Sequence, residues 1–350
     1  MDRLPNIYRH IAKKPDVGPN FRNRKSKIRN LILAVAVGCA SVVGCSSDRE
    51  QPDLVAIGTA STGSGGYNYG VGISRAINEA QTRIRTSVQS TAGFGENLVL
   101  IHQREIQFGL SQGDLLVSAI AGTAPFSEVG PMTDLRWVAG VALPVWHCFV
   151  RADLQINELA DLRGMRFNLG PRQTSTRAIN EMLFEAAGIG LDEIEVFELP
   201  TSTVFDAVQN GVVSGSCNGF PVGYSSLASL TNFKQISLIP IPMDVFRNMQ
   251  QISLSPIVQT IIPAGSYAGA DRNVQSFSGV VVLTTSAATS DERVYAITRA
   301  LWSSLPELRR QPQFSSLVLN TETALGGGTI PVHPGALRYY REQGIDEAQD

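Results

Sequence analysis

From Asp53 onward, short apolar runs alternate with segments whose apolar residues repeat at helical spacing. Residues 54–57 predict a buried strand, and the glycine- and hydroxyl-rich stretch 58–66 predicts a loop after it. The following segment has apolar residues at positions i, i+3, i+4 and i+7, which predicts a helix with one buried face. These residues are Ile73, Ala76, Ile77 and Ala80. Strands that alternate with helices in this way indicate an α/β fold.

A second strand–loop–helix unit follows the same pattern. Residues 167–169 predict a strand that ends at Gly170 and Pro171. The buried stripe of the next helix is expected to consist of Ile179, Met182, Leu183 and Ala186. Gly188 stands where a helix C-terminal cap is expected, so the helix should end just before it.

Near the carboxyl end, residues 279–283 predict one more buried strand. The run Thr289-Ser290-Asp291-Glu292 matches a capping box, in which a hydroxyl and a carboxylate satisfy the first N–H groups of a helix. The predicted stripe of that helix is Val294, Ile297 and Leu301.

Composition narrows the class of protein. The chain has 350 residues, of which 43% are hydrophobic and 17% are charged, and this excludes a disordered chain, a collagen and a multi-span membrane protein. Its length favours two domains, each of which can bury a core of its own.

The net charge of −2 conceals two oppositely charged parts. Up to Cys45, nine basic residues oppose two acidic ones and give +7; the remaining 20 basic and 29 acidic residues give −9. An acidic body is a poor partner for phosphate backbones, so nucleic-acid binding is not expected.

The amino terminus has the pattern of an export signal. A basic cluster over residues 22–29 precedes an apolar run that is too short for the roughly 20 residues of a membrane-spanning helix. Val42-Val43-Gly44-Cys45 resembles a bacterial lipobox, which implies that residues 1–45 are a lipoprotein-type signal and that Cys45 is lipidated. The alternatives are lipidation at Cys39, plain secretory cleavage or an uncleaved anchor.

The loop 58–67 is the richest candidate for ligand binding. Gly58 and Gly63 have the spacing of a phosphate-binding loop, but Ser64 replaces its lysine, so nucleotide hydrolysis is disfavoured. The dinucleotide pattern also fails, because Asn68 stands where a glycine is required. Small residues, hydroxyls and helix-start N–H groups remain as donors for a carboxylate, unless the loop is an ordinary turn.

A similar arrangement recurs at residues 170–176. Thr174, Ser175 and Thr176 lie at the start of the second predicted helix. Any of the three could cap that helix and have no role in ligand binding. Two such loops could instead face each other across a cleft and bind an anion together.

Evidence for an enzyme is thin. Gly215-Ser216-Cys217-Asn218-Gly219 has nucleophile-elbow spacing and His333 follows downstream, but Pro221 soon interrupts the required helix. No spacing of His, Cys and Asp matches a metal site, and we expect no cofactor. Cys148 and Cys217 are expected to be buried strand residues, and whether they pair stays open.

Several blocks, in this order, resemble the TAXI family of solute-binding proteins that serve TRAP transporters. They are spread along nearly the whole chain after Asp53: residues 57–67, 91–98, 110–114 and 262–269, Gly170-Pro171 with Ser175-Thr176, and His333-Pro334-Gly335-Ala336 with Tyr339 and Tyr340. The first block departs from the family in having Ala60 and Ser61 where glycines are usual, together with an apparent extra residue.

This resemblance implies a type II periplasmic binding protein fold, with two Rossmann-like lobes joined by a hinge. We place lobe 1 at 52–143, lobe 2 at 144–276 and the return to lobe 1, with C-terminal helices, at 277–350. The resemblance also implies a monomeric periplasmic receptor that delivers a glutamate-like amino acid or a dicarboxylate to a TRAP permease. The ligand residues it implies are Thr59, Thr62, Tyr67, Asn97, Gln112, Thr174, Ser175, Thr176 and Phe220. The alternatives are a receptor of an ABC importer or a sensor, or a cell-envelope hydrolase that uses Cys217.

Overall fold

The computed structural model describes residues 52–345, except positions 81, 234, 312–313, 315–316, 320–323 and 326–329. The predicted export signal and its lipidation site, Cys45, lie outside the described residues. Across the part that is described, no helix combines the length and the apolar character needed to span a membrane.

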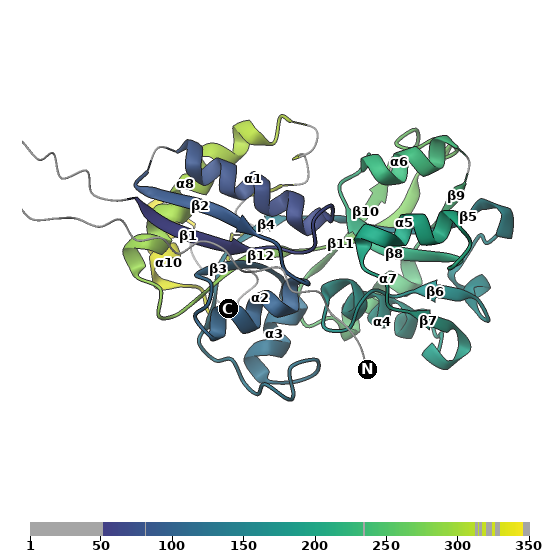
Figure 1. Cartoon of the computed structure of the whole chain (residues 1–350), viewed down its shortest axis with the longest axis horizontal. Helices are drawn as coiled ribbons and strands as arrows, with labels where there is room; N and C mark the ends of the chain where they lie inside the picture. Colours follow the sequence, from purple (N-terminus) through teal and green to yellow (C-terminus); the bar gives the residue numbers. More distant parts are fainter. Residues whose placement is uncertain are drawn as a thin grey trace, which may run out of the picture. The chain divides into compact units, whose positions relative to one another are not determined.

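The first lobe is built on a five-stranded sheet with the order β2-β1-β3-β12-β4. Its strands are β1 (Asp53–Gly58), β2 (Ile84–Gln89), β3 (Phe108–Gln112), β4 (Leu135–Ala142) and β12 (Val281–Ser286). Its helices are α1 (Gly65–Glu79), α2 (Phe94–His102), α3 (Gly113–Ala121), α8 (Asp291–Leu308) and α10 (Pro334–Glu342). Strands β1, β2 and β3 are parallel, whereas β12 runs antiparallel to β3 and β4. Helices α1 and α8 cover one face of the sheet, and α2 and α3 cover the other (Figure 1).

The second lobe is built on a seven-stranded sheet, with the order β10-β11-β5-β8-β6-β7 and β9 also paired to β5. Its strands are β5 (Val145–Arg151), β6 (Arg166–Asn168), β7 (Glu195–Phe197), β8 (Gly215–Phe220), β9 (Ile236–Ile239), β10 (Ile257–Ile262) and β11 (Val274–Gly279). Its α-helices are α4 (Ser175–Ala186), α5 (Thr201–Gln209), α6 (Ser225–Asn232) and α7 (Met243–Ile252). Short 3₁₀ turns lie at Ala152–Leu154, Leu159–Leu162 and Leu191–Glu193.

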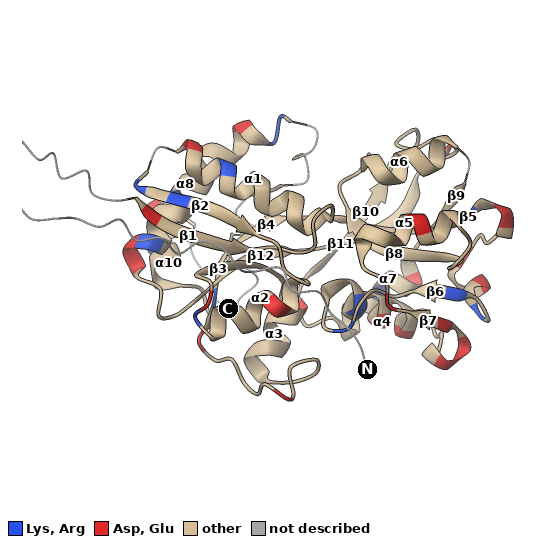
Figure 2. Cartoon of the chain, in the orientation of Figure 1, with Lys and Arg blue, Asp and Glu red and all other residues tan. Residues whose placement is uncertain are grey.

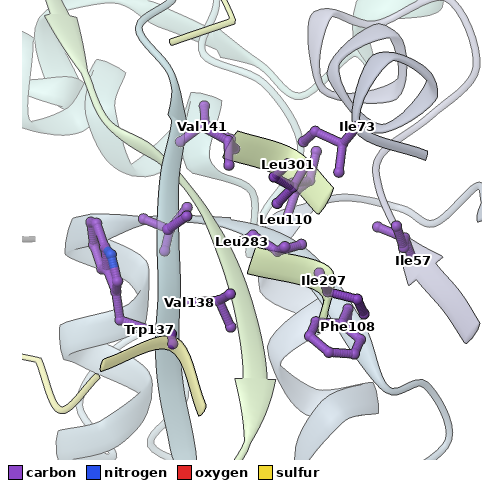
Figure 3. Close-up of a cluster of buried hydrophobic side chains, with 14 of the residues drawn as sticks. Ile57, Ile73, Phe108, Leu110, Trp137, Val138, Val141, Leu283, Ile297 and Leu301 are labelled. Atoms are coloured by element: carbon purple, nitrogen blue, oxygen red, sulfur yellow. The ribbon is translucent and has the colours of Figure 1, made fainter. Parts of the chain in front are cut away.

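Each lobe has a hydrophobic core of its own. In the first lobe, side chains from the sheet interlock with those of α1 and α8, and Figure 3 shows Ile57, Leu110 and Leu283 facing Ile73 and Leu301. The second lobe has separate clusters on the two sides of its sheet. This confirms the predicted α/β fold of two lobes, in which each domain buries its own apolar surface.

The chain crosses between the two sheets twice. It leaves the first lobe between β4 and β5, at Leu143 and Pro144, and returns between β11 and β12, at Val280. The prediction of one strand over residues 279–283 is therefore wrong, because that segment is divided between two sheets. The stretch Phe277–Gly279, which we had placed in the returning segment, pairs with β10 in the second lobe.

Most of the helix predictions are confirmed. In α1, Ile73, Ala76 and Ile77 are fully buried, although the helix begins at Gly65, inside the predicted loop. All four stripe residues of α4 are buried, and Gly188 adopts a left-handed conformation two residues after the helix ends. Helix α8 begins where predicted, but the capping box is wrong: Ser290 forms no side-chain cap, and the hydroxyl of Thr289 bonds that of Thr285 instead.

Cys148 and Cys217 face each other across the antiparallel strands β5 and β8 and form a disulfide, with their Cα atoms 4.0 Å apart. Both side chains are buried in the second lobe. The nucleophile-elbow interpretation is corrected here: Cys217 lies in the middle of a strand rather than at a strand-to-helix turn, and its sulfur is bonded to another cysteine.

Candidate functional site

A pocket lies between the two lobes, at the point where the chain crosses from one to the other. Its space, including the part open to solvent, is about 650 Å³. Pro144, Trp146 and Val281 line it from the crossing segments. Its polar lining comes from both lobes and consists of Ser61, Ser64, Tyr69, Gln112, Thr174, Ser175, Thr176, Thr201 and Asn218.

Four helices begin at this pocket. Gly65 and Gly66 of α1 and Phe94 of α2 line it from the first lobe, and Ser175 of α4 and Thr201 of α5 line it from the second. The first N–H groups of a helix have no partner within the helix, and its N-terminus carries the equivalent of about half a positive elementary charge. The pocket therefore favours an anion from both sides.

Hydroxyl caps fix where two of these helices start. The hydroxyl of Ser64 accepts a hydrogen bond from the Tyr67 backbone N–H at 3.2 Å. The hydroxyl of Thr174 accepts one from the Arg177 N–H at 3.2 Å and donates one to the Pro171 carbonyl at 2.7 Å. Among the three residues predicted as possible caps of the second helix, Thr174 is thus the cap, which leaves Ser175 and Thr176 at its first turn.

Glycines allow the two lobes to approach closely around the pocket. A Cβ atom added to Gly65 would lie 3.1 Å from the Gly219 carbonyl oxygen, and one added to Gly95 would lie 2.2 Å from that of Gln173. Both glycines are in the first lobe and both carbonyls are in the second. At these two places the backbones of the two lobes therefore approach each other directly.

Asn218 orients two hydroxyls of the second lobe. Its side-chain oxygen accepts a hydrogen bond from Thr176 Oγ1 at 3.2 Å, and its side-chain nitrogen donates to Thr201 Oγ1 at 2.9 Å. Since Thr201 accepts from the amide, its own hydrogen is available to a ligand. Thr176 gives its hydrogen to Asn218 and is left with its lone pairs as acceptors.

Gln112, at the end of β3, projects a neutral amide into the pocket lining. The residue as a whole is 4% exposed, and no residue that the structure describes hydrogen-bonds its amide, whose nitrogen and oxygen remain accessible from the pocket. The amide nitrogen packs against Gly279 of the second lobe. An amide that is accessible from the pocket and has no partner in the described protein offers a donor and an acceptor to a polar group that enters.

Within the described chain, none of the residues that line this pocket is Asp, Glu, Lys, Arg or His. The start of α1 is accordingly uncharged in Figure 2, and Arg75 lies further along that helix. Arg172, close in sequence to the pocket, points into solvent and pairs with Glu198 at 2.9 Å. Binding here therefore depends on backbone dipoles, hydroxyls and amides rather than on ionic pairs.

A buried histidine supports the pocket wall from behind. His147, next to the lining residue Trp146, is fully buried: its Nδ1 donates to the Val145 carbonyl at 2.7 Å, and its Nε2 accepts from the Tyr267 hydroxyl at 3.0 Å. Burial lowers the pKa of His147 to about 4, so the ring is neutral at pH 7. The Tyr267 hydroxyl in turn accepts from the N–H groups of Gly223 and Tyr224.

The structure brings four of the nine predicted ligand residues together in the pocket lining. These four are Gln112, Thr174, Ser175 and Thr176. Thr62 is exposed, Tyr67 is half-buried outside the lining, and Phe220 is buried and stacks on Tyr224 with ring centroids 4.4 Å apart.

The remaining two predicted ligand residues, Thr59 and Asn97, donate hydrogen bonds to backbone carbonyls in and beside the strands of the first lobe. The Thr59 hydroxyl donates to the Gln89 carbonyl at 2.8 Å, and the residue is fully buried. The Asn97 amide donates to the carbonyls of Thr59 at 2.6 Å and Leu110 at 2.8 Å, which ties the end of β1 to that of β3. Both residues position the loops that surround the pocket, and neither lines it.

Sequence reasoning missed several lining residues: Ser64, Tyr69, Phe94, Trp146, Thr201 and Asn218. The sequence did point to the first two. Ser64 precedes two glycines, and serine is a favoured helix cap. Tyr69 lies three positions after Gly66, which is about one helical turn. Trp146, Thr201 and Asn218 come from three separate segments of the second lobe, and only the sheet topology brings them together.

The block at His333 has a structural role in the first lobe. His333 precedes α10, where its Nδ1 accepts from the Gly335 N–H at 3.1 Å and its Nε2 donates to the Thr289 carbonyl at 3.0 Å. It thereby fastens the start of α10 to that of α8. In the described residues, no group of three or more His, Cys, Asp or Glu side chains is arranged to hold a metal ion.

Comparison with known proteins agrees with this architecture. The sequence profile of the NMT1-like family matches residues 57–344. The periplasmic binding protein BugD shares the fold with a TM-score of 0.55, at 12% identity over 85% of this chain and 99% of that one. MatC from Rhodopseudomonas palustris, solved with bound malate, has a TM-score of 0.52 at 10% identity, over 76% of this chain and 90% of that one. A protein of Bordetella bronchiseptica RB50 has a TM-score of 0.52 at 13% identity, over 84% of this chain and 99% of that one.

Proposed function

This chain belongs to the NMT1-like family, and from that premise we propose that it is an extracytoplasmic solute-binding protein that captures a small organic anion between its lobes. The observation that carries the proposal is the convergence of four helix N-termini, two from each lobe, on one pocket whose described lining residues carry no charge. Together they supply the electrostatic equivalent of roughly two positive charges, which suits one or two carboxylates.

The proposed mechanism is capture followed by closure about the two crossing segments. A solute that bonds the hydroxyls and N–H groups of one lobe presents its other end to the second lobe, and closure removes water from both. Because the body of the protein is acidic, its overall field does not attract anions, so capture depends on these local dipoles. Malate in MatC, a protein of the same fold, supports a carboxylate solute.

The solute can be tested by calorimetry with dicarboxylates and amino acids. We expect Ser175→Ala with Thr176→Ala to weaken binding on the order of tenfold, since each lost hydrogen bond contributes about 0.5–1.5 kcal/mol. The matched control is Ser225→Ala with Ser229→Ala, an exposed pair on α6 outside the pocket lining. Unchanged affinity in the first variant, with the native fold retained, would contradict the proposed site.

We further propose that the receptor serves a TRAP permease of the TAXI type. This finer assignment is supported by the sequence blocks that resemble the TAXI family, whereas the shared fold fits the receptor of an ABC importer equally well. Uptake by cells that carry this receptor together with its permease separates the two. TRAP-coupled uptake should stop when an ionophore abolishes the ion gradient, whereas ABC-coupled uptake should stop when ATP is depleted and the gradient is kept.

The proposed location is the periplasm, with a lipid anchor at Cys45. It is motivated by the sequence Val42-Val43-Gly44-Cys45 after a basic cluster and a short apolar run. Cys45→Ser should release the protein from the membrane fraction, and Cys39→Ser is the matched control. If Cys39→Ser releases the protein and Cys45→Ser does not, the anchor is at Cys39; if neither does, the protein has no lipid anchor at these positions.

A further inference from the structure

We infer that the pocket selects carboxylates whose other polar groups are uncharged, such as hydroxy or oxo acids, and discriminates against α-amino acids. The inference rests on the proposed function and narrows its solute class. It is carried by two independent features of the pocket: the sign of its electrostatic potential and the neutral, unpartnered amide of Gln112.

The electrostatic argument concerns the ammonium group of an amino acid. The N-termini of α1, α2, α4 and α5 all meet at the pocket, and each repels a cation as it attracts an anion. An ammonium that enters with its carboxylate loses its water and needs a carboxylate or a set of carbonyl acceptors in exchange. The described residues that line the pocket include no Asp or Glu.

Two acidic residues of the first lobe, each two positions from a lining residue, are engaged elsewhere. Asp114 follows Gln112 by two positions, but its carboxylate accepts hydrogen bonds from the Ser253 hydroxyl at 3.0 and 3.1 Å. Glu96, in the first turn of α2, turns back to accept from the Ala92 N–H at 2.5 Å. Neither residue lines the pocket, so neither is placed to neutralise a bound ammonium.

Gln112 supplies what an uncharged substituent needs. The residue is 4% exposed, and its amide, which is accessible from the pocket, has no hydrogen-bond partner among the described residues. It can donate to an oxo or hydroxyl oxygen and accept from a hydroxyl hydrogen. The free hydrogen of Thr201, which Asn218 directs, adds a second neutral donor from the opposite lobe. A hydroxy or oxo acid can therefore satisfy both lobes without bringing a positive charge into the pocket.

Calorimetry with matched solutes tests this selectivity. L-Malate and L-aspartate share one carbon skeleton, as do 2-hydroxyglutarate and glutamate, and within each pair a hydroxyl replaces an ammonium. We expect the hydroxy acid of the pair that fits the pocket to bind at least tenfold more tightly. An amino acid that binds as tightly as its hydroxy acid, or more tightly, would overturn the inference and leave the proposed anion receptor standing.

Failure of the proposed function gives a different result. If none of these acids binds, and oxaloacetate and 2-oxoglutarate do not bind either, the carboxylate receptor and the selectivity inferred from it both fall. The ranking of solutes by the unaltered protein needs no variant, so it is decisive even if a substitution in the pocket prevents folding.

The variant Gln112→Glu tests the residue itself. A carboxylate at this position would pair with an ammonium and repel a second anion, so the preference within each pair should shift toward the amino acid by at least tenfold. Gln89→Glu makes the same chemical change at an exposed position outside the pocket lining and should leave the ranking unaltered. A folded Gln112→Glu protein with the ranking of Gln89→Glu would overturn the role given to Gln112.

Discussion

The hydroxyl of Tyr224, in the second lobe, donates a hydrogen bond to the carbonyl oxygen of Gly63, in the first. Gly63 belongs to the loop that leads into α1 and has a left-handed backbone conformation (φ 83°). The ring of Tyr224 stacks on Phe220, and its backbone N–H donates to Tyr267, so the hydroxyl is held in place by the core of the second lobe. The contact therefore joins a fixed side chain to the loop beside the pocket.

Tyr224→Phe should destabilise the closed state without unfolding either lobe. The ring and its stacking remain, and a single inter-lobe hydrogen bond worth about 0.5–1.5 kcal/mol is lost. We expect solute affinity to fall by about two- to tenfold, mainly through faster release, which stopped-flow fluorescence can measure. Tyr295→Phe removes a hydroxyl that donates to Glu342 within the first lobe and should leave release unchanged. Equal release rates in the two variants would show that the Gly63 contact has no part in closure.

Gly95→Ala should keep the lobes apart. The added methyl group would lie 2.2 Å from the Gln173 carbonyl oxygen, a backbone atom that cannot rotate away. Alanine is the better helix former by about 1 kcal/mol, so the first lobe itself should not lose stability. We expect weak or undetectable solute binding together with an unchanged or raised melting temperature. Small-angle scattering with and without solute would check closure, and a variant that still compacts on binding would contradict the close contact.

The local elements of this fold are readable from the sequence, since burial on one helix face imposes the 3.6-residue spacing seen in α1, α4 and α8. The division of residues 279–283 between two sheets is not readable, because a run of apolar residues looks the same whether it serves one core or two. The crossing between the sheets at Val280 is therefore shown only by the pairing of β11 with β10 and of β12 with β4.

The candidate site was predictable where it follows from a helix start, as with Ser175 and Thr176. It was not predictable where polar residues serve either the ligand or the scaffold. Asn97 and Gln112 are both buried residues with amide side chains, yet the Asn97 amide donates to two carbonyls, whereas no described residue hydrogen-bonds the Gln112 amide. Composition and spacing do not distinguish these two situations, because only the three-dimensional arrangement shows which polar groups are satisfied.

Because Cys148 and Cys217 form a disulfide, neither should react with a thiol reagent in the native, non-reduced protein. After reduction and denaturation, the two should add two reactive thiols. The disulfide closes a long loop, with 69 positions separating the cysteines, so its replacement by two alanines should lower the free energy of unfolding by about 2–4 kcal/mol. Solute affinity should persist, because neither cysteine lines the pocket. The same double variant tests the hydrolase alternative. If the wild type had esterase activity and the variant lacked it, Cys217 would again be a candidate nucleophile.

His147 should make the stability of the protein depend on pH in the mildly acidic range. Burial lowers its pKa to about 4, whereas in the unfolded chain it titrates near the ordinary value of about 6.5. Between these values the unfolded state binds the proton more readily, so stability is complete above about pH 6.5 and is lost as the pH falls toward 4. The shift corresponds to about 3 kcal/mol over this window.

Urea unfolding of the wild type and of His147→Gln, at intervals from pH 8 to pH 4, isolates this contribution. Glutamine keeps a donor for Val145 and an acceptor for Tyr267 but does not titrate, so the difference in unfolding free energy between the two proteins should be constant above pH 7 and should change by about 3 kcal/mol in favour of the variant by pH 4. Burial also lowers the pKa of His333, so the variant should retain part of the slope. Parallel curves for the two proteins over the whole range would mean that His147 accepts its proton in the folded state as easily as in the unfolded one.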